Sequence, residues 1–265
     1  MAASFLKAIF AEAINNPNYF NGRVLTARDL GDEQQAGAQR ARRLGQALGD
    51  PELRASIVLT VACATAATLL ALLLGVPLGY LLARSRFPGR RLVQGLLDLP
   101  VVVPHPVAGI ALLLFLGRNS PVGGALGRLG LEFVSHVPGI VVAMLFVSAP
   151  LLASAAREAF AAVDPRHERV ARTHGDSPWQ SFRRVTLPLA GRGILAGAIL
   201  SWARSVSEFG SIVILTYNPK VASVLIFDRF TAYGLPAAVP AAVLLLLVAL
   251  VVFALVRLIE PRERT

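Results

Sequence analysis

Five long apolar runs constrain the fold of this chain more than any other feature of its sequence. They cover residues 55–83, 92–117, 133–156, 194–216 and 236–258. About 20 apolar helical residues cross the ~30 Å hydrocarbon core of a bilayer, so each run is long enough to span a membrane. In lipid, a helix satisfies its own backbone polar groups. The sequence therefore predicts an all-α integral membrane protein with about five transmembrane helices.

The composition agrees with this class and excludes an ordinary soluble domain. Of the 265 residues, 55% are hydrophobic and 16% are charged, and the mean hydropathy is +0.60. The net charge of +10 comes mostly from arginines between the apolar runs. This placement is typical of cytoplasmic loops of membrane proteins rather than of a nucleic-acid-binding surface. The single cysteine, Cys63, lies in an apolar run, so the sequence shows no disulfide framework.

Residues 1–53 differ from the rest because they are polar and contain no run of membrane length. Their short apolar stretch is interrupted by Glu12, so no cleavable signal peptide is evident. We expect residues 1–53 to form loose helix and coil outside the bilayer core. Residues 54–260 are expected to form the membrane domain.

Prolines interrupt the second apolar run. Pro100 follows Asp98 closely, and Pro104 and Pro106 flank His105. A proline removes a backbone hydrogen bond from a helix, and neighbouring protein must cover the freed groups. One interpretation is a broken helix whose backbone dipoles line an anion path. The other, which we favour, is a packing kink in which His105 bonds to a freed carbonyl.

The fourth run carries two charges, Arg204 and Glu208, four residues apart in apolar sequence. Ser201, Ser205 and Ser211 extend a polar stripe at helical spacing. Charges at membrane depth are costly and face protein or water rather than lipid. The pair is therefore either the wall or gate of a conduit, or a structural ion pair that fixes helix packing.

Three other polar residues have simple structural interpretations. Asp98, near the membrane boundary, is expected to be a helix cap or an ion-pair partner of Arg90 or Arg91. His167 and His174 are seven residues apart. No carboxylate or cysteine pair completes a metal site with them, so we expect a solvated helix face and no bound metal.

The longest polar interval downstream of Arg54, residues 164–188, has apolar runs on both sides. The signals of a first helix are Asp164 as N-cap, Pro165 at the first helical position and Gly175 after the helix end. The signals of a second helix are Ser177 and Gln180 as a capping box around Pro178, and Pro188 as the residue that stops the helix. The interval thus predicts a helix, a tight turn and a second helix. Membrane runs tether it on both sides, which excludes a DNA-binding helix–turn–helix and favours a cytoplasmic docking unit.

The arginine distribution orients the chain. One side of a five-span arrangement carries Arg84, Arg86, Arg90, Arg91, the arginines of residues 164–188, Arg257, Arg262 and Arg264. The other side carries Arg118, Arg128, Lys220 and Arg229. Because cytoplasmic loops carry the excess of basic residues, the first side is predicted to be cytoplasmic, with residue 54 outside. The basic residues 40–43 also lie outside in this arrangement, against the rule.

The polar interval resembles the coupling loop of binding-protein-dependent ABC transporter permeases, whose signature is E-A-A-x3-G-x9-I-x-L-P. The residues at the family spacing are Ala171, Gly175, Val185, Leu187 and Pro188. The chain departs at the start of the signature, where Arg169 and Val170 replace Glu and Ala, and Glu168 comes one residue early. In the family this loop sits in a groove of the ATPase subunit. The resemblance implies a coupling loop at residues 157–192 with contact residues Glu168, Ala171, Gly175, Asp176, Ser177, Pro178, Leu187 and Pro188.

Four further stretches resemble the molybdate/tungstate permeases of this superfamily: residues 85–113, 138–150, 201–219 and 223–235. The resemblance covers roughly residues 50–260. It implies a type I ABC importer transmembrane domain, which forms the channel for molybdate or tungstate in the inner or plasma membrane. The implied partners are a second copy of the chain, two ATPase subunits and an extracytoplasmic oxyanion-binding protein. Sulfate or another small solute is the alternative substrate.

The resemblance also bears on the span count and on the path. The family usually has six spans, and residues 1–53 do not supply the extra N-terminal one. Either the protein lacks that span or the start of the chain is incorrectly chosen.

A transported oxyanion needs polar donors that it contacts in passing, rather than a tight binding site, because it must leave again. The candidate path or gate residues are Arg204, Ser207, Glu208, Phe209, Gly210, Pro104 and His105.

No catalytic motif and no Walker loop is present in the sequence. ATP hydrolysis is therefore expected on a partner ATPase, with ATP and magnesium bound there and no cofactor in this chain. The missing catalytic sets argue against a membrane-embedded enzyme. The coupling loop argues against a passive channel, which needs no ATPase contact.

Overall fold

The computed structural model describes residues 45 and 49–259, and the regular elements from residue 50 onward are all helical. The all-α class is therefore confirmed for the described part of the chain. The loose helix and coil expected at the N-terminus lie almost entirely outside the described residues. Among the described residues, the first membrane helix is α3 (Pro51–Arg84), which begins after the N-cap residue Asp50.

In the described part of the chain, four helical stretches are long and apolar enough to cross a bilayer: Pro51–Arg84, Val137–Ala162, Pro178–Val206 and Leu235–Ala254. A fifth span exists if α4 (Arg90–Val102) and α5 (His105–Leu116), which are bent by 117° at their junction, count as one. The prediction of about five spans is confirmed in this sense. The bend follows from the prolines, since Pro104 caps α5 and Pro106 lies in its first turn.

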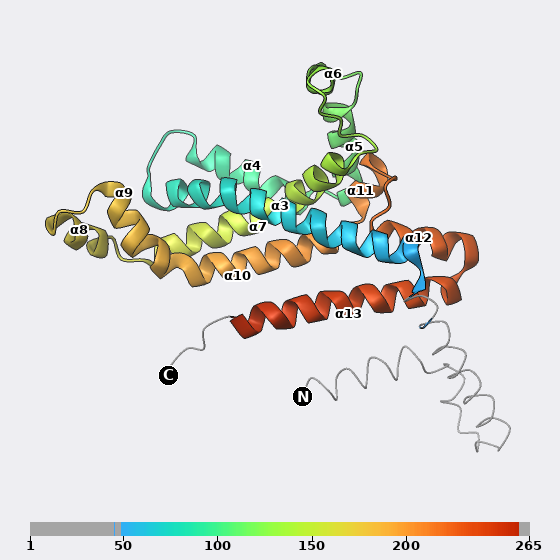
Figure 1. Cartoon of the computed structure of the whole chain (residues 1–265). Helices are drawn as coiled ribbons and strands as arrows, with labels where there is room; N and C mark the ends of the chain where they lie inside the picture. Colours follow the sequence, from blue (N-terminus) through green and yellow to red (C-terminus); the bar gives the residue numbers. More distant parts are fainter. Residues whose placement is uncertain (1–44, 46–48, 260–265) are drawn as a thin grey trace, which may run out of the picture. The chain divides into compact units, whose positions relative to one another are not determined.

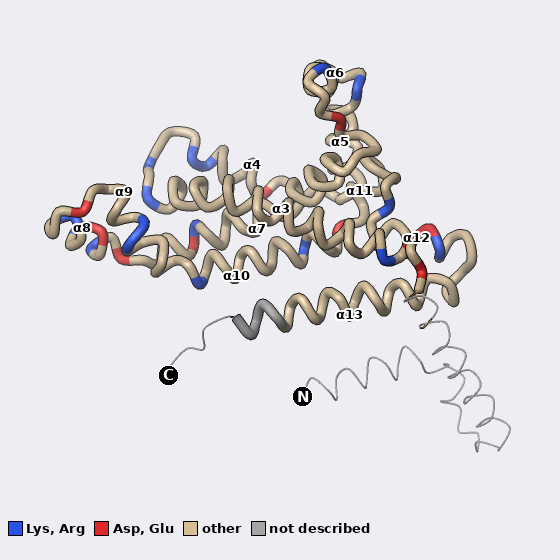
Figure 2. Tube along the Cα trace, in the orientation of Figure 1, with Lys and Arg blue, Asp and Glu red and all other residues tan. Residues whose placement is uncertain are grey.

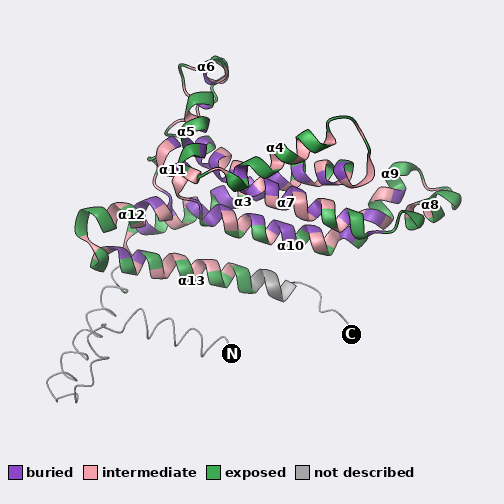
Figure 3. Cartoon of the chain, turned by 180° about the vertical axis from the view of Figure 1, so that it is seen from behind, coloured by how far each residue is buried: buried purple, intermediate pink, exposed green. Residues whose placement is uncertain are grey.

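The packed core is formed by α3, α7 (Val137–Ala162) and α10 (Leu187–Val206), which run side by side (Figure 1). Buried alanines line these contacts, among them Ala64, Ala67, Ala143, Ala153 and Ala198. Small side chains let membrane helices approach closely, and close van der Waals packing replaces the hydrophobic drive that lipid does not provide. Figure 3 shows buried residues concentrated along these helices.

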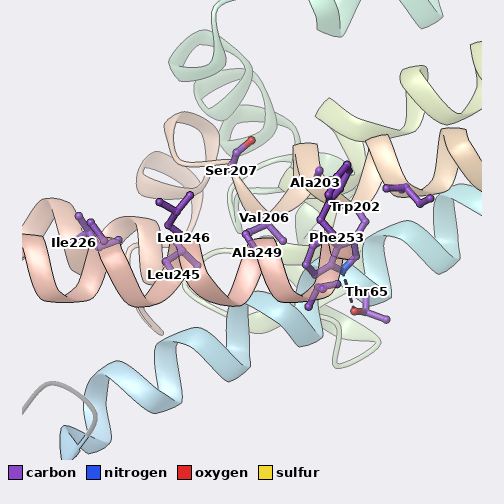
Figure 4. Close-up of a pocket in the computed structure, with 13 residues that line it drawn as sticks. Thr65, Trp202, Ala203, Val206, Ser207, Ile226, Leu245, Leu246, Ala249 and Phe253 are labelled. Atoms are coloured by element: carbon purple, nitrogen blue, oxygen red, sulfur yellow. Dashed lines mark hydrogen bonds between the residues drawn. The ribbon is translucent and has the colours of Figure 1, made fainter. Parts of the chain in front are cut away.

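The last helix, α13 (Leu235–Ile259), packs more loosely. Only 17% of its apolar window is buried, against 56% for the window of α7, so the other helices of this chain leave much of its apolar surface uncovered. An apolar cavity of about 500 Å³ lies between α13, α10 and α3 and reaches α12 (Ala222–Tyr233). Figure 4 shows Trp202 in this cavity, with its Nε1 donating a hydrogen bond to Thr65 Oγ1 at 3.2 Å.

The helix signals of the polar interval are largely confirmed. Asp164 Oδ1 accepts from the Arg166 amide at 2.8 Å at the start of α8 (Pro165–Thr173). Gly175 follows the helix with a φ of +96°, a left-handed conformation that disfavours any Cβ. Ser177 and Gln180 form the expected capping box on α9 (Pro178–Ser181).

The prediction that Pro188 stops the second helix is wrong. The helix continues from α9 through a π-helical turn (Phe182–Thr186) into α10, and Pro188 lies in the first turn of α10. The Leu187 amide donates to the Phe182 carbonyl five residues back. Such a π-turn shifts the hydrogen-bond register, which lets a proline without an N–H follow without ending the helix.

The fourth run also differs from its prediction, because it does not form one helix over 194–216. The span begins earlier, at Pro178, and ends at Val206. Residues 207–209 interrupt it, and the short helix α11 (Gly210–Leu215) follows. The stretch 201–211 is therefore not one continuous helical stripe, since Ser211 lies beyond the interruption.

Charged residues lie mainly at the two ends of the bundle (Figure 2). One end holds the coupling loop and the Arg84–Arg90 connection, and α12 lies at the other end (Figure 1). We expect the first end to be cytoplasmic.

In a Cys63→Ala background, Arg86→Cys and His174→Cys should label with an impermeant maleimide only after permeabilisation, and Ala125→Cys on α6 (Pro121–Arg128) should label from outside. Labelling of positions 86 and 174 from opposite sides would show that α4–α5 does not cross.

At the other end, Asp50 joins α3 to α12. Its Oδ1 accepts from the Glu52 amide at 2.9 Å, and its Oδ2 accepts from Arg229 at 2.5 Å. Burial raises the pKa of Asp50, but the hydrogen bond from Arg229, the backbone N–H donors and the guanidinium charge lower it overall below its usual range. A carboxyl group with a lowered folded-state pKa stabilises the fold above its unfolded pKa, and this stability is lost as the pH falls through the folded pKa.

Replacing Asp50 with Asn keeps a capping side chain and removes the charge. We expect the variant to lose about 0.2–1 kcal/mol of stability at pH 7, as for a partly exposed ion pair. Acidification from pH 7 to pH 3 should then destabilise the variant less than the wild type. Thermal unfolding of the detergent-solubilised protein at both pH values measures this. An equal acid-induced loss in the two proteins would show that the pair contributes nothing.

Candidate functional site

The centre of the candidate site is Glu208, whose side chain is 0% exposed. Its Oε1 accepts two hydrogen bonds from Ser211, from the amide at 2.9 Å and from the hydroxyl at 2.8 Å. Its Oε2 accepts from Arg204 at 2.8 Å. A buried carboxylate is tolerable only with such donors and a counter-ion. The break after α10 makes this possible, because it turns the Glu208 side chain and the free Ser211 amide toward each other.

Arg204 connects this buried carboxylate to the exposed side of the site. Its side chain is 25% exposed, and its Nη1 donates to Ser207 Oγ at 3.1 Å. The exposed Ser207 hydroxyl in turn donates to the Arg204 carbonyl at 2.9 Å, which ties it to the end of α10. The guanidinium is thus held by Glu208 on one side and still presents N–H groups outward.

His105 joins the site from the second broken run. Its Nε2 lies 3.6 Å from Glu208 Oε2, and its side chain is 39% exposed. The expected hydrogen bond from His105 to a freed carbonyl is not found in the described part of the chain. The imidazole faces a carboxylate instead, because the kink at Pro104 brings the start of α5 against the break after α10.

Close backbone contact holds the two breaks together. A Cβ at Gly210 would lie 2.8 Å from the His105 Cβ, and one at Gly109 would lie 2.8 Å from the Ser211 carbonyl oxygen. Only glycine fits either position without displacing its neighbour. The structure therefore unites two candidate sites that the sequence presented separately, the Pro104–His105 kink and the Arg204–Glu208 pair.

Other predicted residues lie elsewhere or act differently. Phe209 packs in the apolar core beside Phe227, with ring centroids 5.0 Å apart. Asp98 lies inside α4, so it is not a cap, and among the described residues it forms no ion pair with Arg90 or Arg91. It lines a small polar pocket with Arg157 of α7 instead. Asp98 therefore lies beside α7.

The two coupling-loop histidines lie on exposed surface, as expected for a solvated face. His167 Nδ1 lies 3.1 Å from the Asp164 carbonyl oxygen. No cluster of three metal-ligating side chains occurs among the described residues.

Glu168 has a role that the family signature did not predict. Its Oε1 accepts from Thr186 at 2.6 Å and lies 3.5 Å from Arg84 Nη2. Its carbonyl accepts from the Ser181 hydroxyl at 3.2 Å. Glu168 thereby fastens α8 to the π-helical turn and to the end of α3. Sequence spacing could not show this, because Arg84 is far from Glu168 along the chain.

An aromatic cluster continues this joint into the bundle. Tyr80 of α3 packs edge-on against Phe160 of α7 and Phe182 of the π-turn, with centroids 5.2 Å and 4.8 Å away. Trp179 stacks on Phe182 at 5.5 Å and is 66% exposed. Packed side chains therefore join the coupling loop directly to α3, α7 and α10.

Comparison with known proteins identifies the family. A family described as binding-protein-dependent transport system inner membrane component matches residues 75–265. The chain belongs to this family. It is 44% identical to the molybdate/tungstate transport system permease protein of Thermococcus kodakarensis over 83% of this chain and 84% of that protein. It is 34% identical to the sulfate transport system permease protein of Synechocystis sp., over 82% of this chain and 80% of the relative.

A solved structure supports the fold. A bacterial ABC transporter involved in import of the polysaccharide alginate superposes with a TM-score of 0.66 at 20% identity, covering 99% of this chain and 96% of that one. At this identity the likeness speaks for the fold alone. The predicted ABC importer transmembrane fold is therefore confirmed. This permease is a multi-pass membrane protein and the membrane component of its transport system, not its ATPase.

Proposed function

We propose that this permease forms the translocation path for molybdate or tungstate in an ATP-driven importer. The observation that carries the proposal is the partly exposed cation at the meeting point of two broken spans, where Arg204 is anchored to fully buried Glu208. Interrupted helices at membrane depth are typical of substrate sites in transporters. The 44% identical relative is named a molybdate/tungstate permease, which supports these dianions as substrates.

Path and gate roles are proposed for Arg204, Ser207, Glu208, Phe209, Gly210, Pro104 and His105. The first three and His105 supply polar groups, while Phe209 and the small residue Gly210 fix the contact between the two breaks. Arg204 is shared with Glu208, so an oxyanion would meet a partly neutralised cation. Such a site binds weakly enough for the anion to leave again.

The proposed assembly is two copies of this chain, two ATPase subunits and an extracytoplasmic binding protein. The exposed Trp179 and Val170 of the coupling loop are suited to an apolar groove on an ATPase, and Gly175 aims α9 toward that groove. Closure of the ATPase dimer on ATP would move both coupling loops together. The helix bundles would then rock and open the path outward, with ATP and magnesium held by the ATPase alone.

Sulfate is the second candidate substrate, because a sulfate permease is also 34% identical over most of the chain. All three anions are tetrahedral dianions, so the path alone discriminates them poorly. ATP hydrolysis by the reconstituted transporter, measured with each anion and its binding protein, tests the proposal. Stimulation by molybdate or tungstate supports it. Stimulation by sulfate alone would make the chain a sulfate permease, and no stimulation by any oxyanion would overturn the proposal.

A further inference from the structure

The surface of the coupling loop carries unpaired charge of predominantly one sign. Residues 164–188 contain five arginines and three acidic residues. All three carboxylates are engaged, since Asp164 caps α8, Glu168 bonds to the π-helical turn and Asp176 pairs with an arginine of the loop. The other four arginines are exposed, and none forms an ion pair with a described residue: Arg166, Arg169, Arg172 and Arg183. The charge that remains available to a partner is therefore mainly positive.

The outer side of α8 contains the two positions at which the chain departs from the family signature. Arg169 and Val170 stand in place of Glu and Ala, and both side chains are exposed. Arg166 precedes them by three and four residues, so the three side chains share one side of the helix. Glu168 points elsewhere, toward Arg84 of α3, and is only 14% exposed. The outer side thus carries a cation where the signature has a carboxylate.

The second helix of the loop adds an aromatic side chain to this surface. Trp179 is largely exposed although it stacks on Phe182, and the exposed Arg183 follows it by one turn of the same helix. Tryptophan and arginine are enriched among the residues that dominate protein interfaces. The capping box and the aromatic cluster hold both side chains in place before a partner binds, which lowers the entropy cost of docking.

We propose that the ATPase groove that receives this loop is acidic, with carboxylates opposite Arg166, Arg169 and Arg183 around an apolar floor for Val170 and Trp179. This inference rests on the proposed function, which supplies the ATPase, and adds the charge of its docking surface. Complementary charges speed the encounter of two proteins, and like charges exclude a wrong partner. This permease should therefore reject an ATPase whose groove is basic and suited to the glutamate of the signature.

Anionic lipid headgroups also attract arginines, but their attraction falls off within a Debye length of the membrane surface. In Figure 1, α8 and α9 lie past the end of the packed helices, whereas the connection that contains Arg86 lies beside those helices. The arginines of the loop are also interspersed with the exposed apolar side chains of Val170 and Trp179. A protein groove accounts for both kinds of side chain.

The test measures the Kd between the purified ATPase subunit and the full-length permease in nanodiscs of phosphatidylcholine, which has no net charge. The variants are Arg169→Glu and the double change Arg166→Glu/Arg169→Glu, while Arg169→Lys keeps the charge. Arg86→Glu, exposed at the same end but outside the loop, is the matched control. Each Kd is measured at about 50 and about 500 mM salt, because salt screens exposed charges.

The wild-type Kd should rise roughly tenfold over this salt range. At low salt, Arg169→Glu should weaken binding by about tenfold and the double variant by more, and both should respond less to salt. Arg169→Lys and Arg86→Glu should stay within about twofold of the wild type. These results would establish an acidic groove.

A wild-type Kd independent of salt, or wild-type affinity in Arg169→Glu, would overturn the inference. Loss of transport by Arg169→Glu only in vesicles that contain phosphatidylglycerol, with ATPase binding unchanged, would assign the arginines to lipid headgroups instead. Molybdate uptake by the wild-type transporter is measured separately. Its absence would overturn the proposed substrate, while the Kd values would still decide the charge of the groove. No binding of the ATPase to the wild type would overturn both.

Discussion

Replacing Arg204 with Ala should lower both the folding yield and the transport activity of the permease. Glu208 would keep its two hydrogen bonds from Ser211 but lose its cation while remaining fully buried. Removal of one partner of a buried ion pair typically costs about 3–5 kcal/mol. We expect a severalfold lower yield of monodisperse protein in detergent, together with uptake at background level.

The double variant Arg204→Ala/Glu208→Ala separates a structural pair from a transport role. It leaves no uncompensated charge, so the folding yield should return toward the wild-type value. Arg118→Ala, which breaks an exposed pair with Glu132, is the matched control and should change neither quantity. Recovery of yield with transport still absent is the expected result. Recovery of both would mean that the pair only holds the helices together.

The features that the sequence predicted correctly are local ones. Apolar length predicts the membrane helices, and the caps at Asp164 and Ser177 depend on residues only two or three positions away. The left-handed turn at Gly175 is likewise predicted by the glycine itself and by its position directly after a helix. Local signals of this kind act within one turn of the chain, so a single sequence is enough to read them.

The features that it missed depend on tertiary contacts or on backbone adjustments. The π-turn carries the helix past Pro188, and the interruption after Val206 has no proline to announce it. The contact between His105 and Glu208 joins residues about a hundred positions apart, and no periodicity reports such a distance. Glu168 lies one residue before the position of the glutamate in the family signature. It accepts a hydrogen bond from Thr186, and only the three-dimensional structure reveals this contact.

Replacing Gly175 with Val should uncouple the permease from its ATPase while the membrane domain stays intact. Nothing lies within 4 Å of a Cβ at this position, so no clash is expected. The φ of +96° is the obstacle, because a β-branched residue disfavours the left-handed region strongly. The turn would adopt another conformation and re-aim α9 with its exposed Trp179. We expect co-purification of the ATPase and substrate-stimulated ATP hydrolysis to fall at least severalfold.

Gly191→Val is the matched control for this change. A Cβ at Gly191 would also have no atom within 4 Å, but this glycine lies in α10 without a positive φ. The control should therefore bind and stimulate the ATPase normally. Membrane insertion and labelling topology should be unchanged in both variants. Normal ATPase binding and hydrolysis in Gly175→Val would mean that the loop is a tolerant surface turn and would reject its coupling role.

The most direct measurement is uptake of labelled molybdate into proteoliposomes that contain the permease, its ATPase and its binding protein. Wild-type uptake should require ATP on the ATPase side. It should be lost in Arg204→Ala/Glu208→Ala at an equal amount of folded, ATPase-bound transporter. This result is predicted if the two broken spans form the oxyanion path and the coupling loop powers it. Uptake without ATP, or equal uptake by the double variant, would contradict the account.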